Sequence, residues 1–346
     1  MDDGRRGAQG TGTGTGTGQS GWTSQASAVA EQFATVAEAV GLAVVGRGEA
    51  LEQLLVALLC RSHVLLEDAP GTGKTLLARS LASALGCDFG RLQLTPDVLP
   101  SDITGSSVFD QRSVSFEFRP GPVFTQVLLA DEINRATPRS QSALLEAMEE
   151  AQVTVDGHTR PLPQPFFVLA TQNPLEMEGT FPLPEAQLDR FGLRVTLGYP
   201  SPEEERAILR RYETDRVPEV NAVLDPAGVL ALQRARGDVS VSDDLTSYLL
   251  RLVRATRDDP RLSLGASPRA ALALHRAVQA RALLRGRSFA LPDDVKALAV
   301  PVLAHRLVVA APARLRGTTG ASVLAEILEA EEVPVEEDLL GSPLPG

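Results

Sequence analysis

The stretch from residue 63 to residue 82 combines residue types that bind phosphate. Val64, Leu65 and Leu66 form a short apolar run of the kind that a parallel sheet buries on both faces. A Gly-rich turn follows, and Lys74 and Thr75 then begin a helix. Such a turn directs backbone N–H groups and a helix N-terminus at an anion. The residues that we expect to line the bound phosphates are Asp68, Ala69, Pro70, Gly71, Thr72, Gly73, Lys74 and Thr75.

This turn is a P-loop with one departure from the motif G-x-x-x-x-G-K-[ST], because Asp68 stands where the motif has glycine. We expect Asp68 to change the start of the loop without removing a phosphate ligand. Lys74 would reach the β- and γ-phosphates of ATP, and the hydroxyl of Thr75 would ligate Mg²⁺. The alternative is an ordinary Gly-rich turn, but the flanking strand and helix favour the P-loop.

Two acids and an amide follow later strands, where hydrolysis would need them. Asp131 and Glu132 end the apolar run 127–130, and Asn173 follows the run 166–171. We expect Asp131 to hold Mg²⁺ through water, Glu132 to polarise the attacking water and Asn173 to hold that water near the γ-phosphate. The alternatives are a helix cap for the acidic pair and a simple Asn-Pro turn for Asn173.

Arginines complete the set, because an Arg at a subunit boundary can stabilise transition-state charge in a neighbour's site. Arg190 lies just before the last apolar run, and Arg269 lies at a helix start. Arg135 could also project toward a neighbour, and the sequence does not rank it against Arg190. For each arginine the alternative is a surface ion pair.

Alternating strands and helices must position these residues. We predict an α/β fold with a parallel five-stranded sheet covered by helices on both faces. A smaller all-helical lid should follow, because no strand is evident beyond Leu197. The expected strands lie at 64–66, 91–94, 127–132, 166–171 and 193–197, the expected hairpins at 107–118 and near 153–155, and the expected helices at 28–39, 49–60, 140–151, 226–236, 243–257, 268–285, 292–305 and 322–331.

Composition sets the domain boundaries and the expected compartment. Residues 1–27 are rich in Gly and Thr, so we expect a disordered tail, and residues 316–346 read as an acidic, Pro-rich tail. The nucleotide-binding domain should span 28–199 and the lid 200–315. Cys60 and Cys87 are the only cysteines, which fits free thiols in a reducing cytoplasm. We expect no membrane span and no signal peptide.

The residues then carry a resemblance to a known family. The blocks that resemble MoxR-type AAA+ ATPases of the helix-2-insert clade are EDAPGTGKT at 67–75, FRPGPVF at 118–124, ADEINRA at 130–136, ATQNP at 170–174, LPEAQLDRF at 183–191 and GASPRA at 265–270. The resemblance covers residues from about 36 to 307. The two tails lie outside it.

This resemblance assigns a role to each matching position. It implies that Lys74 and Thr75 form Walker A, and that Asp131 and Glu132 form Walker B. It makes Asn173 sensor 1, Arg190 the arginine finger and Arg269 sensor 2 on the lid. Gln93 would be a switch residue that restrains Glu132 until a partner binds. The hairpin at 107–118 would be the helix-2 insert, and the hairpin near 153–155 the pre-sensor-1 insert.

Three functions remain open from the sequence. The resemblance implies an ATP-driven remodelling or maturation factor that forms a homo-oligomer, with a hexameric ring as the family expectation, and acts on protein clients, typically with a von Willebrand factor A domain. A nucleic-acid motor is the second, although 33 basic against 44 acidic residues give a net charge of −11 that argues against it. A nucleotide-gated scaffold with little turnover is the third, and the pair Asp131–Glu132 argues for hydrolysis instead.

Overall fold

The computed structural model describes residues 17–173, 179–212 and 218–334. Residues 1–16 and 335–346, where the sequence predicts disorder, lie outside the described residues. The first helix, α1, spans Thr17–Ala43. The prediction of a disordered tail up to residue 27 is therefore wrong for residues 17–27. Ala26 is buried, so apolar contacts of the helix begin earlier than the Gly-Thr composition indicates.

The sheet of the first domain is parallel and has five strands in the order β2-β5-β8-β1-β9. This confirms the predicted fold class. The strands are β1 (His63–Glu67), β2 (Phe89–Gln93), β5 (Val127–Asp131), β8 (Phe167–Gln172) and β9 (Phe191–Val195). The three central strands are almost entirely buried, which explains why they read as continuous apolar runs.

Alternate residues of the strands serve two separate cores. Val64 and Leu66 face a core shared with α1 and the two helices that flank β1 in sequence, whereas Leu65 faces a second core on the other side of the sheet. Successive side chains of a strand point to opposite faces of the sheet, and here the residues on both faces are buried. The helices of this domain are α2 (Gly48–Leu59), α3 (Lys74–Ala84), α4 (Pro100–Thr104), a 3-10 turn at Ile133–Arg135, α5 (Pro138–Glu150) and α6 (Glu185–Leu188).

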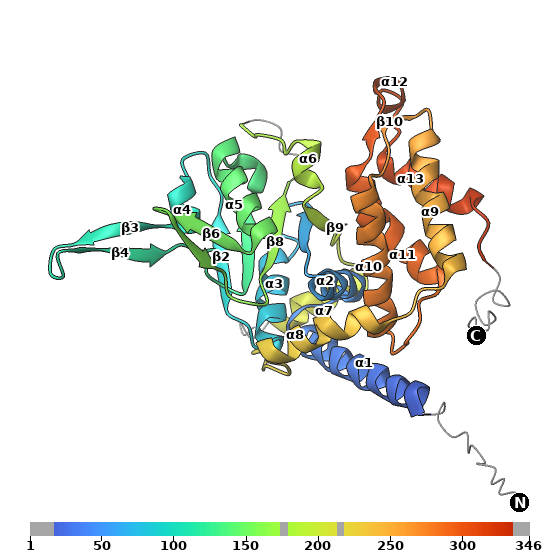
Figure 1. Cartoon of the computed structure of the whole chain (residues 1–346), viewed down its shortest axis with the longest axis horizontal. Coiled ribbons are helices and arrows are strands. Elements are labelled where there is room, and N and C mark those ends of the chain that lie inside the picture. The colour runs from blue at the N-terminus through green and yellow to red at the C-terminus, as the bar shows by residue number, and fades with distance from the viewer. Residues whose placement is uncertain (1–16, 174–178, 213–217, 335–346) are drawn as a thin grey trace, which may run out of the picture.

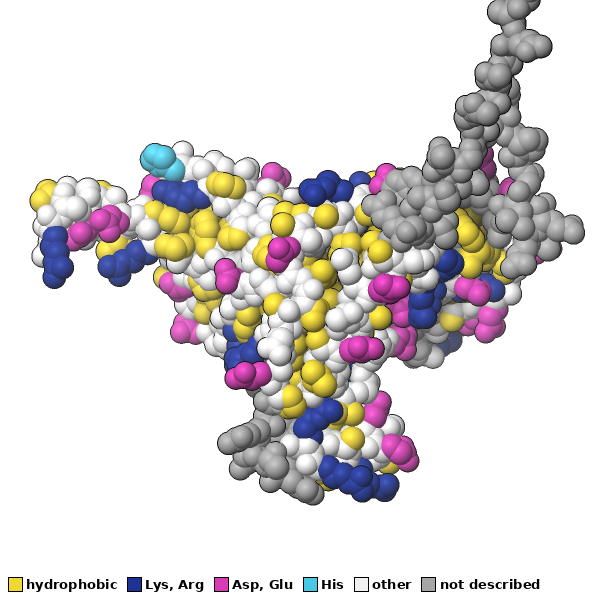
Figure 2. Space-filling model, turned by 90° about the horizontal axis from the view of Figure 1, so that it is seen from below, with side chains coloured by type: hydrophobic (Ala, Val, Ile, Leu, Met, Phe, Trp, Pro, Cys, Tyr) yellow, Lys and Arg dark blue, Asp and Glu magenta, His cyan; other side chains and the backbone are white. Residues whose placement is uncertain are grey.

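Two hairpins are inserted in this domain where the sequence predicts them. Strands β3 (Gly105–Asp110) and β4 (Ser115–Pro120) pair antiparallel, as do β6 (Gln152–Val155) and β7 (His158–Pro161). The first hairpin projects far from the body (Figure 1). Figure 2 shows it from below, standing clear of the molecule with charged and hydrophobic side chains at its surface. Its ring pair Phe109–Phe116 lies at 5.4 Å between centroids, and Phe116 is 73% exposed.

The second domain is a helical lid beside the sheet (orange and red in Figure 1). Its elements, with the helices that lead into it, are α7 (Pro202–Tyr212), α8 (Pro226–Ala235), a 3-10 turn at Arg236–Asp238, α9 (Asp243–Asp258), β10 (Leu262–Leu264), α10 (Pro268–Leu284), α11 (Pro292–Leu303), the 3-10 turn η3 (Ala304–Arg306), β11 (Val308–Val309), α12 (Ala311–Arg314) and α13 (Gly320–Ala330). The short antiparallel pair β10–β11 contradicts the prediction that no strand follows Leu197. These strands have three and two residues, too few to show a period of two.

The lid also extends further than predicted. Val323 and Leu324 of α13 are fully buried in the core that α9 and α11 share. The boundary expected at residue 315 is therefore wrong, because α13 belongs to the lid up to Ala330. No helix among the described residues is long and apolar enough to span a bilayer.

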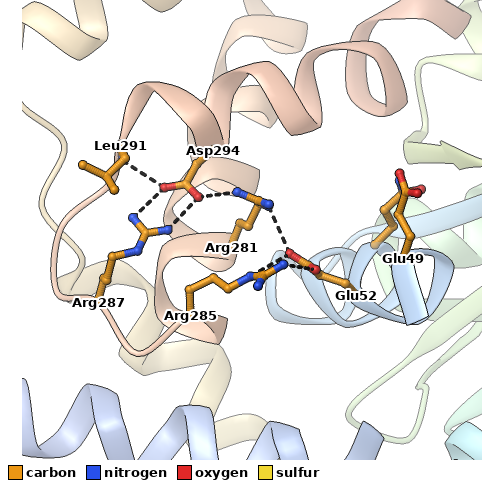
Figure 3. A network of polar contacts seen from close by, with 8 residues as sticks. Glu49, Glu52, Arg281, Arg285, Arg287, Leu291 and Asp294 are labelled. Carbon is orange, nitrogen blue, oxygen red and sulfur yellow. Dashed lines mark hydrogen bonds and ion pairs between the residues drawn. The ribbon is translucent and has the colours of Figure 1, made fainter. Parts of the chain in front are cut away.

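A chain of ion pairs joins the lid to helix α2 of the first domain (Figure 3). Glu52 on α2 pairs at 3.0 Å with Arg281, on α10, and at 2.7 Å with Arg285, the residue that follows α10. Arg281 also pairs with the fully buried Asp294 of α11, which Arg287 contacts from its other side. The buried carboxylate thus has two cationic partners, as a buried charge requires.

Candidate active site

The carboxyl ends of β1, β5 and β8 meet at one edge of the sheet, where they open a cavity of about 420 Å³. The predicted residues that line it are Lys74, Thr75, Asp131, Glu132 and Asn173. These residues lie up to 99 positions apart in the chain, and parallel strand order brings them to the same edge. This cavity is therefore the candidate site for a triphosphate.

The loop between β1 and α3 has the backbone that phosphate binding requires. Gly71 and Gly73 adopt φ of +81° and +91°, a region that favours glycine. The ammonium of Lys74 donates to the carbonyl oxygens of Asp68 at 2.8 Å and Ala69 at 3.0 Å. Burial lowers the pKa of Lys74, while the carboxylates of Asp68, Asp131 and Glu132 act in the opposite direction. The cation therefore lies against the loop, beside the space for phosphates.

Asp68 has a different role from the other loop residues. One carboxylate oxygen accepts from the N–H of Ala69 at 2.9 Å. The other accepts from the N–H groups of Leu197 and Gly198, both at 2.9 Å. Asp68 is buried, so its side chain points away from the phosphate cavity and joins the start of the loop to the segment after β9. The sequence prediction that Asp68 itself contacts phosphate is not supported for its side chain.

The two acids after β5 are held by neighbouring side chains. The hydroxyl of Thr171 donates to Asp131 at 3.2 Å and accepts the N–H of Glu132 at 2.9 Å. Arg91 on β2 pairs with the other oxygen of Asp131 at 2.7 Å. Glu132 has φ of +59°, which is uncommon for a residue with a side chain. Such an outlier is characteristic of functional sites.

Gln93 contacts the acid that the sequence predicts it to restrain. Its amide nitrogen donates to a carboxylate oxygen of Glu132 at 2.9 Å. Arg91 in turn donates to the amide oxygen of Gln93 at 3.3 Å. Arg91 and Gln93 are two residues apart on β2, so their side chains share one face of the strand. Both acids thus have a partner from the same strand.

The donor set around the cavity fits Mg²⁺. Thr75 and Asp131 supply hydroxyl and carboxylate oxygens, the hard ligands that Mg²⁺ prefers beside phosphate. Among the residues that the structure describes, neither sulfur nor imidazole lines this cavity, and the oxygen ligands fit Mg²⁺ better than a softer metal.

A second, more apolar cavity of about 270 Å³ adjoins the first across the loop. It shares Gly71, Gly73 and Leu76 with the phosphate cavity. Its further lining includes Val45, Tyr199 and Ile208. An apolar cavity directly beside a phosphate loop is suited to a nucleobase.

The structure does not bring Arg190 and Arg269 to this cavity. Arg190 directly precedes the first residue of β9, whereas the phosphate loop follows the last residue of β1. β1 and β9 are parallel, and His63 lies beside Phe191. Arg190 therefore lies at the amino ends of the strands and the phosphate loop at their carboxyl ends, about 16 Å apart for five residues of strand. The roles expected for Arg190 as the finger and for Arg269 as sensor 2 on the lid stay predictions, and neither side chain lines the phosphate cavity of its own chain.

Both arginines instead line a separate cavity of about 340 Å³ between the sheet and the lid. Arg190 pairs with Glu149 at 3.1 Å, and Arg269 pairs with the same carboxylate at 3.4 Å. Arg269 is 57% exposed along its side chain. Arg135, the alternative finger, lies elsewhere and pairs with Glu132 of its own chain at 3.4 Å.

Comparison with known proteins identifies this arrangement. Residues 63–193 match the ATPase family associated with various cellular activities (AAA), and residues 254–327 match the AAA lid domain. The chain is 42% identical over 300 residues to the chaperone MoxR1 of Mycobacterium tuberculosis, across 84% of this chain and 79% of MoxR1. The chain belongs to the MoxR family of AAA+ ATPases.

Two further proteins are similar to this chain over most of its length. The protein YeaC of Bacillus subtilis is 47% identical over 300 residues, which cover 86% of this MoxR family member and 94% of YeaC. The crystal structure of a proposed ATPase from Cytophaga hutchinsonii superposes with a TM-score of 0.85 at 37% identity. That superposition covers 92% of this chain and 100% of the Cytophaga chain.

Sequence reasoning missed several residues of this MoxR family site. Thr171 and Arg91 contact the two acids, and Val45, Tyr199 and Ile208 line the apolar cavity beside the loop. The alternation Arg91-Leu92-Gln93-Leu94 is a signal for Arg91, because it places Arg91 beside the predicted switch residue. Nothing local marks Tyr199 or Ile208, which meet the loop only through tertiary structure. Pro174 of the predicted Asn-Pro turn lies outside the described residues.

Proposed function

We propose that this protein is a Mg²⁺-dependent ATPase whose active site is shared between two copies of the chain. The observation that carries the proposal is the distance, within one chain, between the phosphate-binding residues and the predicted finger Arg190. The phosphate cavity at the carboxyl ends of the strands is lined by Lys74, Asp131, Glu132 and Asn173. Arg190 lies at the opposite, amino ends of the strands. A P-loop site without an arginine is typically slow, and a finger supplied by a neighbour completes it.

Within one chain, the loop binds and orients the triphosphate. The N–H groups of the loop and the ammonium of Lys74 hold the β- and γ-phosphates, and the phosphates replace the carbonyls that Lys74 now contacts. Thr75 and Asp131 would hold the metal, Thr75 through its hydroxyl and Asp131 through water. Mg²⁺ supplies charge neutralisation at the phosphates when bound. The base cavity beside Tyr199 receives the adenine.

Glu132 polarises the attacking water, and Asn173 orients it. Glu132 is engaged by Gln93 at 2.9 Å, so this contact has to be released before the carboxylate reaches water. We propose that partner binding or ring closure releases it. Arg190 and Arg269 of a neighbouring copy then stabilise the charge that develops on the γ-phosphate.

We infer that the assembly is a closed ring, hexameric by the family expectation, because two different surfaces of the chain meet at each interface. Contacts of this head-to-tail kind close into rings. The remodelling of protein clients, typically with a von Willebrand factor A domain, is the role that we propose for this ring. The name of the relative MoxR1 as a chaperone supports a protein client. The net charge of −11 disfavours the nucleic-acid alternative.

Mixed oligomers test the shared site. Arg190→Ala should bind ATP normally and hydrolyse it on the order of 10³-fold more slowly. Lys74→Ala should bind no ATP but still carries Arg190. When the two variants are mixed, some interfaces pair an intact pocket with an intact arginine, so activity should exceed the sum of the separate rates. A mixture that forms hetero-oligomers yet shows only this sum would exclude Arg190 as the trans finger and favour Arg135.

A further inference from the structure

The backbone on both sides of Arg190 is held by the lid. Asp189 precedes Arg190, and Phe191 follows it as the first residue of β9. The guanidinium of Arg306, in the turn η3 of the lid, forms an ion pair with Asp189 at 2.8 Å. It also donates to the carbonyl oxygen of Phe191 at 2.8 Å. One lid side chain therefore brackets the predicted finger residue.

Arg306 is itself fixed within the lid. Its second terminal nitrogen donates to the carbonyl of Val302 at 2.7 Å, four residues earlier. The neighbouring His305 places its Nε2 at 3.0 Å from the same Phe191 carbonyl. The side chain of Arg306 is only 5% exposed. Burial lowers the pKa of Arg306, and the charge of Asp189 raises it, so the carboxylate favours the charged form of the guanidinium.

The contacts of Arg190 are looser than those of Arg306. Arg190 donates to the carbonyl of Leu145 at 2.9 Å and pairs with Glu149, but its side chain is 32% exposed. It also lines an open cavity beside Arg269. The tip of Arg190 can thus leave Glu149 for a phosphate, while the backbone that carries it stays attached to the lid.

We propose that Arg306 is the positioning residue of the finger: through the carboxylate of Asp189 and the carbonyl of Phe191, it holds Arg190 where a neighbouring subunit's nucleotide meets it. This inference rests on the shared active site proposed above. Arg306 touches no nucleotide, and its effect passes through Arg190. Because Arg306 belongs to the lid, the same contacts make the lid's position set the place of the finger.

Arg306 also shares Asp189 with the second trans-acting candidate. Arg269 approaches Asp189 at 3.8 Å, a longer distance than the 2.8 Å of Arg306. Asp189 is thus primarily the partner of Arg306, which leaves the exposed Arg269 free to exchange partners. Arg306 stays fixed while Arg190 and Arg269 change theirs.

The test is Arg306→Lys in the full chain, with Arg316→Lys as a matched control at an exposed position of the lid. Lysine keeps the charge for Asp189, but its single ammonium cannot reproduce the forked contacts with Phe191 and Val302. A displacement of about 1 Å at a reacting group costs up to ~10²-fold in rate. We expect kcat to fall about 10- to 100-fold and the ATP affinity, measured by calorimetry, to stay within about twofold. Arg316→Lys should match the wild type.

Two readouts separate positioning from a general structural effect. Mixing Arg306→Lys with Lys74→Ala should restore activity above the sum of the separate rates, because Lys74→Ala supplies intact Arg190 and Arg306 to its neighbour. The double variant Arg190→Ala/Arg306→Lys should be no slower than Arg190→Ala alone. If Arg306→Lys folds poorly, Asp189→Asn takes its place in both readouts. Asp189→Asn removes the carboxylate charge that Arg306 pairs with and leaves the contacts of Arg306 with Phe191 in place.

The outcomes also distinguish this inference from the proposed function. If Arg190→Ala hydrolyses ATP at the wild-type rate, both the trans finger and its positioning residue are overturned. If Arg190→Ala is slow and is rescued by mixing, but Arg306→Lys keeps wild-type kcat, only the role of Arg306 is overturned. The role of Arg306 is also overturned if the fold-loss in kcat of Arg190→Ala/Arg306→Lys equals the product of the fold-losses of the two single variants.

Discussion

Asp68→Gly restores the residue that the P-loop motif prefers, and we predict that it nevertheless destabilises the protein. The buried carboxylate of Asp68 accepts from the backbone N–H groups of Ala69, Leu197 and Gly198, each at 2.9 Å. Glycine removes the two oxygens that accept these three hydrogen bonds. The N–H of Leu197 is buried in that contact, so it is left without its acceptor.

The magnitude follows from these three bonds. A hydrogen bond to a charged group contributes about 1.5–3 kcal/mol to stability, and a buried donor without a partner costs about 1–3 kcal/mol. Because the bonds share one carboxylate, they are not additive. We expect a loss of about 3–5 kcal/mol in the free energy of unfolding, which corresponds to a Tm lower by roughly 6–20 °C for domains of this size.

Thermal melting by circular dichroism measures this shift. Asp68→Asn is the matched control, since its amide has nearly the same shape and keeps one acceptor oxygen without the charge. It should lose about half as much stability as Asp68→Gly. A Tm for Asp68→Gly within about 1 °C of the wild type would refute the reasoning, because it would mean that the loop and the segment after β9 hold together without this carboxylate.

Two other predictions follow from the site and the core. Glu132→Gln should bind ATP but lose hydrolysis, because the amide cannot polarise water in the same way; light scattering should show an ATP-bound oligomer, and wild-type turnover would remove Glu132 from the mechanism. His63 accepts from Val168 and lies 2.9 Å from the carbonyl of Met148, and burial lowers its pKa from 6.5 to about 4. As the pH falls, His63 is therefore protonated in the unfolded chain before it is protonated in the folded one. Its contribution to the free energy of unfolding is complete above pH 6.5 and falls by about 1.4 kcal/mol per pH unit as the pH drops toward 4. Urea unfolding at pH 7 and pH 5 should show this dependence weakened in His63→Gln, and an unchanged dependence would exclude His63 as its source.

Local patterns predict the sheet and the phosphate loop well. Continuous apolar runs mark β1, β5 and β8 because both faces of these strands are buried. The glycines, Lys74 and Thr75 act within one loop, so their spacing alone indicates a phosphate site. The acids after β5 follow from the same reasoning, since parallel strands present their carboxyl ends at one edge.

Residues that depend on tertiary placement were harder to predict. Asp68 is adjacent to the loop in sequence, but its partners Leu197 and Gly198 lie about 130 residues away, which no local pattern records. Arg269 carries a lid motif, yet only the packing of α10 shows that it lies beside Arg190. The start of α1 at Thr17 was missed because composition reports chain flexibility rather than the contacts made later in the helix.

The ion pairs of Glu52 are the part of the contact between α2 and the lid that salt can reach. Asp294 is fully buried and pairs with Arg281 of α10 and with Arg287 of the connection between α10 and α11, so solvent ions have little access to these pairs. Glu52 is partly open to solvent, and its partner Arg285 is 54% exposed, so salt weakens this contact first. Buried apolar residues of α2 and α10 belong to the same core, so salt would weaken the ion pairs while the apolar contact between the two helices remains. Because α2 leads directly into β1 and the phosphate loop, this salt-sensitive contact of the lid lies next to the strand that carries the nucleotide loop.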